Sequence, residues 1–415
     1  MSHTKATVLL AGLTMGLSGA ALAQSTMDEA RALASERRGD AYRATLAQGA
    51  QTGPEFYGLL QFQYNWVILG DGGMGGEDFA NGFQNNRTQL GARGTVADGW
   101  EYNILGDFSN SSPESGTAAG VFNLLDYYVT IPVPGFNDKA KLTIGQFKLP
   151  FLYEENVAAQ NQLLGERSPA NEFFNQGRSE GILLTYAGEE DDAYRFQAAF
   201  ADGFRTGATP IGSPIEADFQ VGGRFDYKFY GSWEQFEDFT ADPSTPETAL
   251  RIGGAIYYQE GGDTSSGLGA TTFDNDILGV TGDIQWEYNQ WSAFGAFQLQ
   301  DSDGMMSLGG TDVGFVAQGG YRHDENHEGF ARFSIIIADS MTPGTTMDAD
   351  DLPEFAFGYN YYVFGDQSAK FTADIVFIFD TVSTSLLPAG QSNISLFPDI
   401  DDPQVALRSQ FQVTF

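Results

Sequence analysis

From Phe56 onward, the chain is divided into segments of about ten residues in which apolar and polar side chains alternate. The last segment shows this most clearly, with one face formed by Val405, Leu407, Phe411, Val413 and Phe415 and the other by Arg408, Gln410, Gln412 and Thr414. Because the side chains of a β-strand point alternately to its two faces, each segment predicts a strand with one apolar and one polar face. A soluble sandwich could contain one such strand, but a whole chain of them is typical of strands between lipid and water. We therefore expect an all-β fold, a transmembrane antiparallel up-and-down β-barrel.

Sixteen segments of this kind can be counted, an even number, as single-chain bacterial barrels require. The predicted strands lie near residues 56–69, 83–95, 100–109, 121–131, 140–148, 179–187, 193–201, 217–229, 249–259, 276–288, 291–300, 312–322, 329–338, 353–363, 369–380 and 405–415. Long and short connections alternate between them, as external loops and periplasmic turns do in such barrels. The stretch around 230–248 is long where a short turn is expected, so it could mark a misplaced boundary. Phe415 also favours a barrel, because assembly machinery reads a C-terminal aromatic residue on the apolar face of its strand.

The N-terminal residues are typical of an export signal followed by a separate segment. Lys5 precedes an apolar stretch that runs to about Leu22, and Ala21-Leu22-Ala23 is a small-x-small cleavage site. We expect a signal peptide at 1–23 with cleavage near Ala23, an N-terminal periplasmic segment at 24–55, and an outer-membrane barrel at 56–415. The segment 24–55 is centred on a stretch rich in Ala, Leu, Glu and Arg, and it is either a short packed helix or a mostly unfolded leader.

The composition fits a barrel and disfavours several classes of partner. Mean hydropathy is −0.24, as in a soluble protein, yet 14% of the residues are aromatic, 51 are glycine and only 18% are charged. In a barrel, the apolar lipid-facing residues and the polar residues of the lumen together give a mean hydropathy like that of a soluble protein. The formal charge is −34, and removal of Lys5 with the signal makes it −34 − 1 = −35, so bulk electrostatics disfavours nucleic acid and anionic lipid head groups as partners. The outer-membrane lipids that we expect around the barrel would contact its apolar strand faces. The chain has no cysteine, which excludes disulfides and thiolate metal sites.

The sequence lacks the residue patterns of common enzyme and cofactor sites. His323 and His327 have the spacing of a helical zinc site, but they fall in a predicted turn between strands. No Gly-x-Ser-x-Gly elbow occurs, and the glycine-rich stretch 70–76 lacks the Lys-Ser/Thr of a phosphate loop. The acidic clusters 348–351 and 399–402 are better explained as solvated loop tips than as calcium sites. We therefore expect no enzyme activity, no cofactor and no metal site.

The most distinctive segment surrounds the third long connection, at about 149–178. Its motifs follow in order as Ile144-Gly145-Gln146-Phe147-Lys148-Leu149-Pro150-Phe151, Glu154-Glu155, Gly165-Glu166-Arg167-Ser168 and Gly177-Arg178-Ser179-Glu180-Gly181. This succession resembles that of the phosphate- and polyphosphate-selective porin family, strongly over roughly 40 residues and at the level of architecture over 56–415. The resemblance implies a barrel of 16 strands, usually a homotrimer, whose third loop folds inward to narrow the pore.

Charged side chains of this loop are candidates for the pore constriction. We expect them to be Glu154, Glu155, Glu166, Arg167 and Arg178. A loop of about 30 residues exceeds ordinary hairpin connections, and loops of that length are usually functional or disordered. The alternative is that these residues only hold the loop against the barrel wall, since every inward loop also needs anchoring.

Alternation also places basic side chains on the inward faces of the strands. The expected pore-lining residues are Arg87, Arg93, Arg195, Arg224, Lys228, Arg251, Lys370 and Arg408, partly offset by Glu101, Asp107, Asp226, Asp283, Glu287 and Asp374. Opposed charges give a transverse field that slows apolar solutes, whereas an unbroken basic track would favour anions. We expect a porin for passive diffusion of small hydrophilic solutes or ions, with phosphate and other anions as candidates. A structural outer-membrane protein with an incidental pore and a barrel enzyme are the alternatives.

Overall fold

A computed structural model of the protein describes the barrel and the connections that fold into it. The described residues are 53–69, 79–97, 99–109, 122–136, 139–187, 192–207, 211, 216–243, 248–261, 275–304, 310–338, 351–380, 396 and 403–415. The chain divides into two compact units, Met1–Gln51 and Thr52–Phe415, and every described residue belongs to the second. The expected signal peptide and the expected helix within 24–55 therefore lie outside the described residues.

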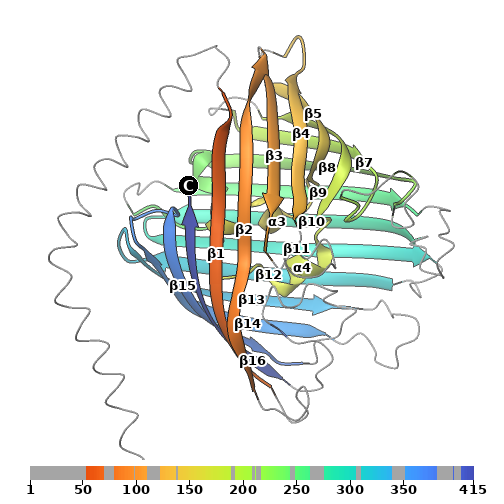
Figure 1. Cartoon of the computed structure of the whole chain (residues 1–415). Helices are drawn as coiled ribbons and strands as arrows, with labels where there is room; N and C mark the ends of the chain where they lie inside the picture. The colour runs from red at the N-terminus through yellow and green to blue at the C-terminus, as the bar shows by residue number, and fades with distance from the viewer. Residues whose placement is uncertain are drawn as a thin grey trace, which may run out of the picture. The chain divides into compact units, whose positions relative to one another are not determined.

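Sixteen antiparallel strands form one closed barrel, in which each strand pairs with its neighbours along the chain and β1 pairs with β16 (Figure 1). They are β1 (Glu55–Ile68), β2 (Phe79–Ala97), β3 (Trp100–Asp107), β4 (Asn123–Pro132), β5 (Ala140–Lys148), β6 (Arg178–Tyr186), β7 (Tyr194–Ala201), β8 (Phe219–Tyr230), β9 (Ala249–Glu260), β10 (Asn275–Tyr288), β11 (Trp291–Gly304), β12 (Gly310–Arg322), β13 (His327–Ile337), β14 (Leu352–Tyr362), β15 (Ala369–Ile378) and β16 (Gln404–Thr414). All sixteen predicted strands are confirmed, with ends that shift by only a few residues. The stretch around 230–248 marks no misplaced boundary, because β8 ends at Tyr230 and β9 begins at Ala249.

The first and last strands close the barrel with a regular ladder from Leu59↔Thr414 to Ile68↔Val405. The backbone N–H of Gly58 donates to the Phe415 oxygen at 2.8 Å, and the Phe415 N–H donates back at 3.2 Å. A Cβ atom at Gly58 would lie 2.8 Å from the Gln89 carbonyl oxygen and 2.5 Å from the Phe415 ring, so this close approach favours glycine. Closure removes the sheet edges, which lets strand backbone be hydrogen bonded within the lipid region.

The alternating sequence separates an apolar outer surface from a polar inner one. Along β14 the outward residues Phe355, Phe357 and Tyr359 are exposed, whereas the intervening Glu354 and Asn360 side chains are buried inside the barrel. Exposed aromatic side chains suit contact with lipid, and inward polar side chains suit a lumen that water can enter.

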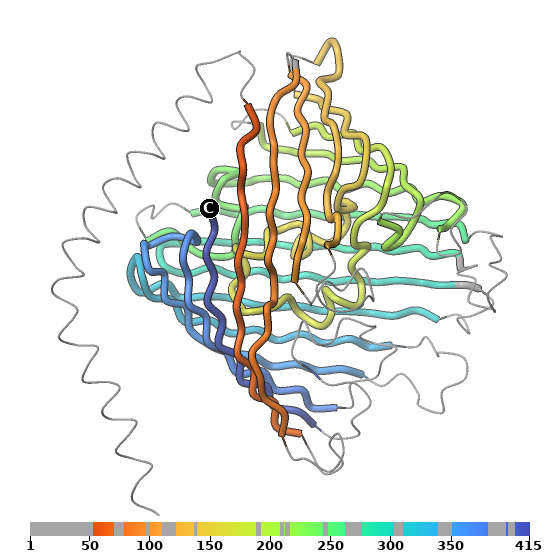
Figure 2. The backbone as a smooth tube through the Cα atoms, in the orientation of Figure 1, coloured from red at the N-terminus to blue at the C-terminus, as the bar shows by residue number. Residues whose placement is uncertain are grey.

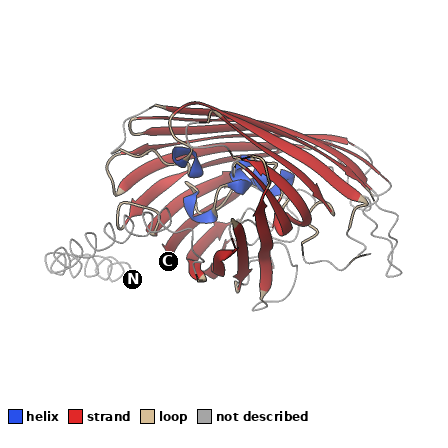
Figure 3. Ribbon diagram, turned by 90° about the horizontal axis from the view of Figure 1, so that it is seen from above, coloured by secondary structure: helices blue, strands red, loops and turns tan. Residues whose placement is uncertain are grey.

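Two connections fold into the barrel. The third loop, residues 149–177 between β5 and β6, carries α3 (Tyr153–Asn156), η2 (Ala159–Asn161) and α4 (Pro169–Phe174), and the short helices lie inside the ring of strands when the barrel is seen from above (Figure 3). The backbone trace shows the yellow-green segment of this loop crossing the lumen behind β1 and β2 (Figure 2). The connection between β8 and β9 carries η3 (Glu234–Glu237). Among the described residues, no helix has the length and apolar character to cross a membrane.

The third loop packs against one half of the barrel wall. Its apolar residues form a single core with inward-facing apolar residues of strands β9 to β16: Phe151, Leu152, Val157, Leu163, Leu164, Ala170 and Phe174 from the loop, and Tyr257, Phe294, Val316, Phe330, Ile336, Ala356, Val376 and Ala406 from the wall. On the opposite half, strands β1 to β4 carry mostly polar inward residues, which include Gln61, Gln63, Asn65, Arg87, Gln89, Asp107, Asp126 and Thr130. Because the third loop and its packing contacts fill one half of the lumen, the open space lies along the other half, beside β1 to β6.

Candidate pore constriction

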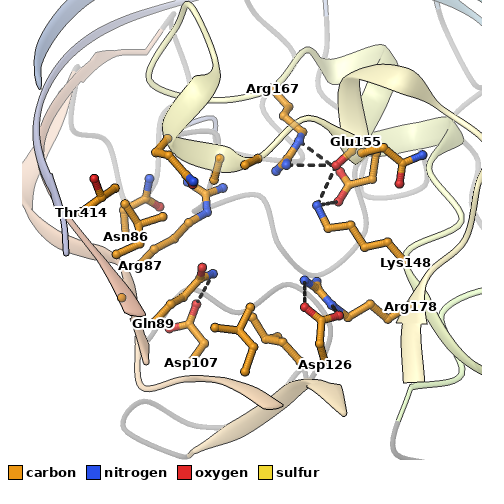
Figure 4. Close-up of a pocket in the computed structure, with 18 of the residues that line it drawn as sticks. Asn86, Arg87, Gln89, Asp107, Asp126, Lys148, Glu155, Arg167, Arg178 and Thr414 are labelled. Carbon is orange, nitrogen blue, oxygen red and sulfur yellow. Dashed lines mark hydrogen bonds and ion pairs between the residues drawn. The ribbon is translucent and has the colours of Figure 1, made fainter. Parts of the chain in front are cut away.

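A cavity of about 480 Å³ lies between the third loop and the wall formed by the first six strands. Charged side chains from the wall and the loop point toward this opening (Figure 4). Six basic residues line it together with five acidic ones, namely Arg87, Arg93, Lys148, Arg167, Arg178 and Arg205 with Asp107, Asp126, Glu155, Glu166 and Glu172. The lining therefore has mixed charge, with one more basic than acidic residue.

A β-bulge in β2 brings two neighbouring polar side chains to the cavity edge. The ladder between β1 and β2 shifts register between Gln61 and Phe62, which leaves Asn86 as the extra residue. Asn86 and Arg87 both donate hydrogen bonds to the Glu166 carboxylate, and Arg87 forms an ion pair of 2.9 Å with it. Glu166 thereby anchors the middle of the third loop to the wall across the cavity.

Glu155 connects the two ends of the third loop. Its carboxylate forms ion pairs with Lys148 Nζ at 2.9 Å and with Arg167 Nε at 3.2 Å, and it accepts a hydrogen bond from Asn171 Nδ2 at 3.1 Å. Burial alone would raise the pKa of Glu155, but Arg167 and Lys148 outweigh it and hold that pKa well below its usual range. Glu155 therefore carries a fixed negative charge between two cations at the cavity.

Glu154 lies on the other side of α3, outside the cavity. Its two carboxylate oxygens accept from the Ser168 backbone N–H and hydroxyl, each at 2.7 Å, and Arg332 lies 3.9 Å away. Burial raises the pKa of this carboxyl above its usual value. Ser168 also accepts from the Asn171 N–H as the N-cap of α4, so the structure supports the anchoring alternative for Glu154.

Two further cations enter the cavity from the β6 side. Arg178, the first residue of β6, donates to both carboxylate oxygens of Asp126 in β4, at 2.8 and 3.2 Å. Arg205 belongs to the connection between β7 and β8, and its Nη2 donates to the Glu172 carbonyl oxygen at 2.5 Å. Its backbone has a positive φ of 53°, a conformation that costs about 1–3 kcal/mol for a residue of this kind. A hydrogen bond of 3.0 Å from its N–H to the Gln176 carbonyl oxygen supports this geometry.

The eight basic residues expected to line the pore do face inward, but the structure divides them into two groups. Arg87 and Arg93 line the cavity, and Arg93 is exposed and paired with Glu55 at 2.8 Å. The other six contact the inward-folded segments or buried acids: Arg195, Arg224, Lys228, Arg251, Lys370 and Arg408. They lie on the half of the barrel that the third loop and the β8–β9 connection cover, where alternation cannot distinguish a covered position from an open one.

Three residues of this second group, Arg224, Lys370 and Arg408, hold the third loop in place. Arg224 donates to the Phe151 carbonyl oxygen at 2.9 Å, and Lys370 donates to those of Gln160 at 3.1 Å and Gln162 at 2.7 Å. Arg408 pairs with Asp374 at 2.6 Å, and the same carboxylate accepts from the Gly165 N–H. Inward cations thus hold the backbone of the third loop on the covered half.

Several cavity residues were not among the predicted site residues. Lys148 stands within the motif that carries the family resemblance, and Asp126 shares an inward face with Thr130, so both could have been found from the sequence. Glu172 belongs to the third loop, whose polar residues the sequence already makes candidates for solute contact. Arg205 lies in a connection without strand periodicity, and no sequence signal places it at the cavity. Arg332, an anchor of the loop, could have been found by the alternation in β13.

Comparison with known proteins agrees with this architecture. OmpF of Salmonella typhi, in a complex with daunomycin, is 12% identical with a TM-score of 0.57, over 88% of this chain and 100% of that chain. OprB of Pseudomonas putida is 12% identical with a TM-score of 0.53, over 88% and 94% of the two chains. A trimer form of OmpT of Vibrio cholerae is 12% identical with a TM-score of 0.51, over 88% and 100%. These similarities show the fold.

A search of curated proteins gives no match. The family model described as phosphate-selective porin O and P matches residues 69–344, which is well over half of the chain and includes the third loop. A closed barrel of sixteen strands, an inward-folded third loop and a charged cavity beside that loop are the features of a diffusion pore. The chain therefore belongs to the phosphate-selective porin O and P family of outer-membrane porins.

Proposed function

We propose that this porin passes small hydrophilic solutes and ions by diffusion through the cavity beside the third loop, with a weak preference for anions. The observation that carries the proposal is the ring of six basic and five acidic residues around that cavity. An excess of one cation favours anions, but the acids between the basic residues prevent an unbroken anion path.

Strong phosphate selectivity is disfavoured by the pairing of these cations. An anion that loses water in a narrow passage needs hydrogen-bond donors in place of that water. Arg87 pairs with Glu166, Lys148 and Arg167 pair with Glu155, and Arg178 pairs with Asp126. Because these donors already have carboxylate partners, a passing phosphate would compete with them, and we infer that phosphate is one of several permeant anions.

Three of the predicted constriction residues would serve both roles considered from the sequence, since Glu155, Glu166 and Arg167 line the cavity and also hold the loop. Arg178 lines the cavity and pairs with Asp126 of the wall. We further propose that the protein resides in the outer membrane as a homotrimer after removal of residues 1–23. The trimer form of OmpT of Vibrio cholerae, which shares this fold, supports that assembly. Family membership favours a channel over an enzyme.

Swelling of liposomes that contain the purified protein would test the proposal. Neutral sugars, zwitterionic amino acids and small organic anions of matched size should all enter, because nothing in the ring excludes one charge class. Vesicles without protein serve as the control. Swelling no faster than in that control would contradict a diffusion pore, and entry of phosphate alone would contradict the weak preference.

A further inference from the structure

Residues 231–243, the described part of the connection that follows β8, also fold into the barrel, and we call this segment the inner turn. The inner turn reaches strands far around the ring. Trp233 Nε1 donates to the Asp192 carbonyl oxygen next to β7 at 2.8 Å, and Gln367 Nε2, next to β15, donates to Thr240 Oγ1 at 3.2 Å. A connection that only reversed the chain would need two to five residues and would not extend so far.

Aromatic burial holds the inner turn in this place. The side chains of Trp233, Phe236 and Phe239 are no more than 2% exposed, although a connection at the mouth of a water-filled barrel would ordinarily be polar. Removing these three large apolar rings from water favours the packed position. Such burial indicates a packed element.

Inward cations of the neighbouring strands cover these rings. The Arg195 guanidinium lies 4.2 Å and the Lys228 ammonium 5.2 Å from the Trp233 ring, and the Arg251 guanidinium lies 6.0 Å from the Phe236 ring. Cation–π contacts of this kind are favourable away from bulk water. Inward basic residues of β7 to β9 therefore stabilise the inner turn.

The inner turn contacts the first half of the third loop directly. The Tyr153 hydroxyl donates to the Phe236 carbonyl oxygen, and Asn161 Nδ2 donates to the Glu237 carbonyl oxygen at 3.0 Å. The Phe239 ring lies 6.4 Å from the Tyr153 ring, edge to face. Tyr153 and the cavity residue Glu155 belong to the same short helix, α3, and are two residues apart. A shift of the inner turn would therefore move Tyr153 and, with it, the Glu155 side chain in the cavity.

We propose that the inner turn is a positioning element of the pore, which supports α3 and thereby fixes Glu155 and its partner Arg167 in the cavity. Phe239 is its main positioning residue, because it packs against both Tyr153 of the loop and Phe294 of the wall, with ring centres 4.8 Å apart in the second pair. The inference rests on the proposed function, since it assigns a determinant of conductance and ion preference to a segment outside the cavity.

Single-channel recording of the Phe239→Ala variant tests this proposal. Loss of the ring should let α3 move, so conductance should rise roughly 1.5-fold or more, current noise should increase and the anion preference should weaken. Phe239→Tyr, which keeps the ring, should restore the wild-type values. The matched control is Phe364→Ala, which removes an exposed phenylalanine from the β14–β15 connection.

A second variant covers the case in which Phe239→Ala fails to fold. Asn161→Ala removes one side-chain donor to the inner turn from an exposed position, and it should increase current noise with a smaller rise in conductance. If folded Phe239→Ala matches Phe364→Ala in conductance, noise and reversal potential, or if Asn161→Ala matches wild type where Phe239→Ala does not fold, the positioning role is wrong. Absence of current through the wild-type protein would instead contradict the proposed function.

Discussion

The Glu172 carboxyl lies on the loop side of the cavity, within a group of charges that affects its protonation. Burial and the neighbouring Glu155 raise the pKa of Glu172 to about 7, although Arg167 and Arg205 act in the opposite direction. Glu155, by contrast, stays ionised. Within the third loop, one lining carboxylate is therefore permanent and another can change charge near neutral pH.

This difference predicts a pH-dependent ion preference. A carboxyl with a pKa of about 7 is ionised above that pH and neutral below it, so acidification through neutral pH should remove one negative charge from the ring. The reversal potential in a salt gradient should move toward the value expected for a pore that passes only anions, which we call the anion limit. Glu172→Gln should show the low-pH value throughout. A pH shift of unchanged size in Glu172→Gln would assign the effect to another group, such as Asp238, whose pKa burial also raises to about 7.

The Arg178–Asp126 pair gives a second test at the scale of single residues. Arg178→Ala removes one cation and leaves Asp126 without its two-point partner, so the ring becomes charge-balanced and the anion preference should fall. The expected change is about 1 kcal/mol, or roughly fivefold in the permeability ratio, for a unit charge at short range in water. Lys139→Ala is the control, because Lys139 pairs with Asp192 outside the cavity. Equal reversal potentials for the two variants would show that the ring does not set selectivity.

The third loop depends on the barrel wall for its structure. Its helices α3 and α4 have 4 and 6 residues, and helices of that length are not stable alone in water. Arg332 of β13 donates to Glu354 at 2.7 and 3.1 Å and to the Glu166 carbonyl oxygen of the loop at 2.8 Å. The side chains of Arg332 and Glu354 are both buried, so this contact is sensitive to loss of either partner.

We therefore expect Arg332→Ala to destabilise the folded protein by about 3–5 kcal/mol, because it leaves Glu354 as an unpaired buried charge. Arg93→Ala, which removes an exposed ion pair with Glu55, should cost about 0–1 kcal/mol. Denaturant unfolding of the two variants in the same detergent measures both changes. A cost for Arg332→Ala no larger than that for Arg93→Ala would mean that the loop does not depend on this anchor.

At the scale of the whole barrel, alternation predicted the number of strands and their approximate ends, because a period of two is imposed by lipid on one side and water on the other. It did not show which inward positions meet water. Arg224 and Arg87 look alike in the sequence, yet one is covered by the third loop and the other lines the cavity. The later strands do carry apolar residues at inward positions, such as Phe294 and Val376. Such residues indicate that another segment of the chain covers this part of the wall. The reach of the inner turn depends on contacts between distant segments, which periodicity does not encode.

The measurement that tests the account most directly is the reversal potential of the wild-type protein in a planar bilayer under a salt gradient. Stable current steps should appear, with a reversal potential displaced toward the anion limit but well short of it, as a ring of six basic and five acidic residues predicts. Absence of current, or a potential on the cation side, would contradict a mixed-charge diffusion pore beside the third loop.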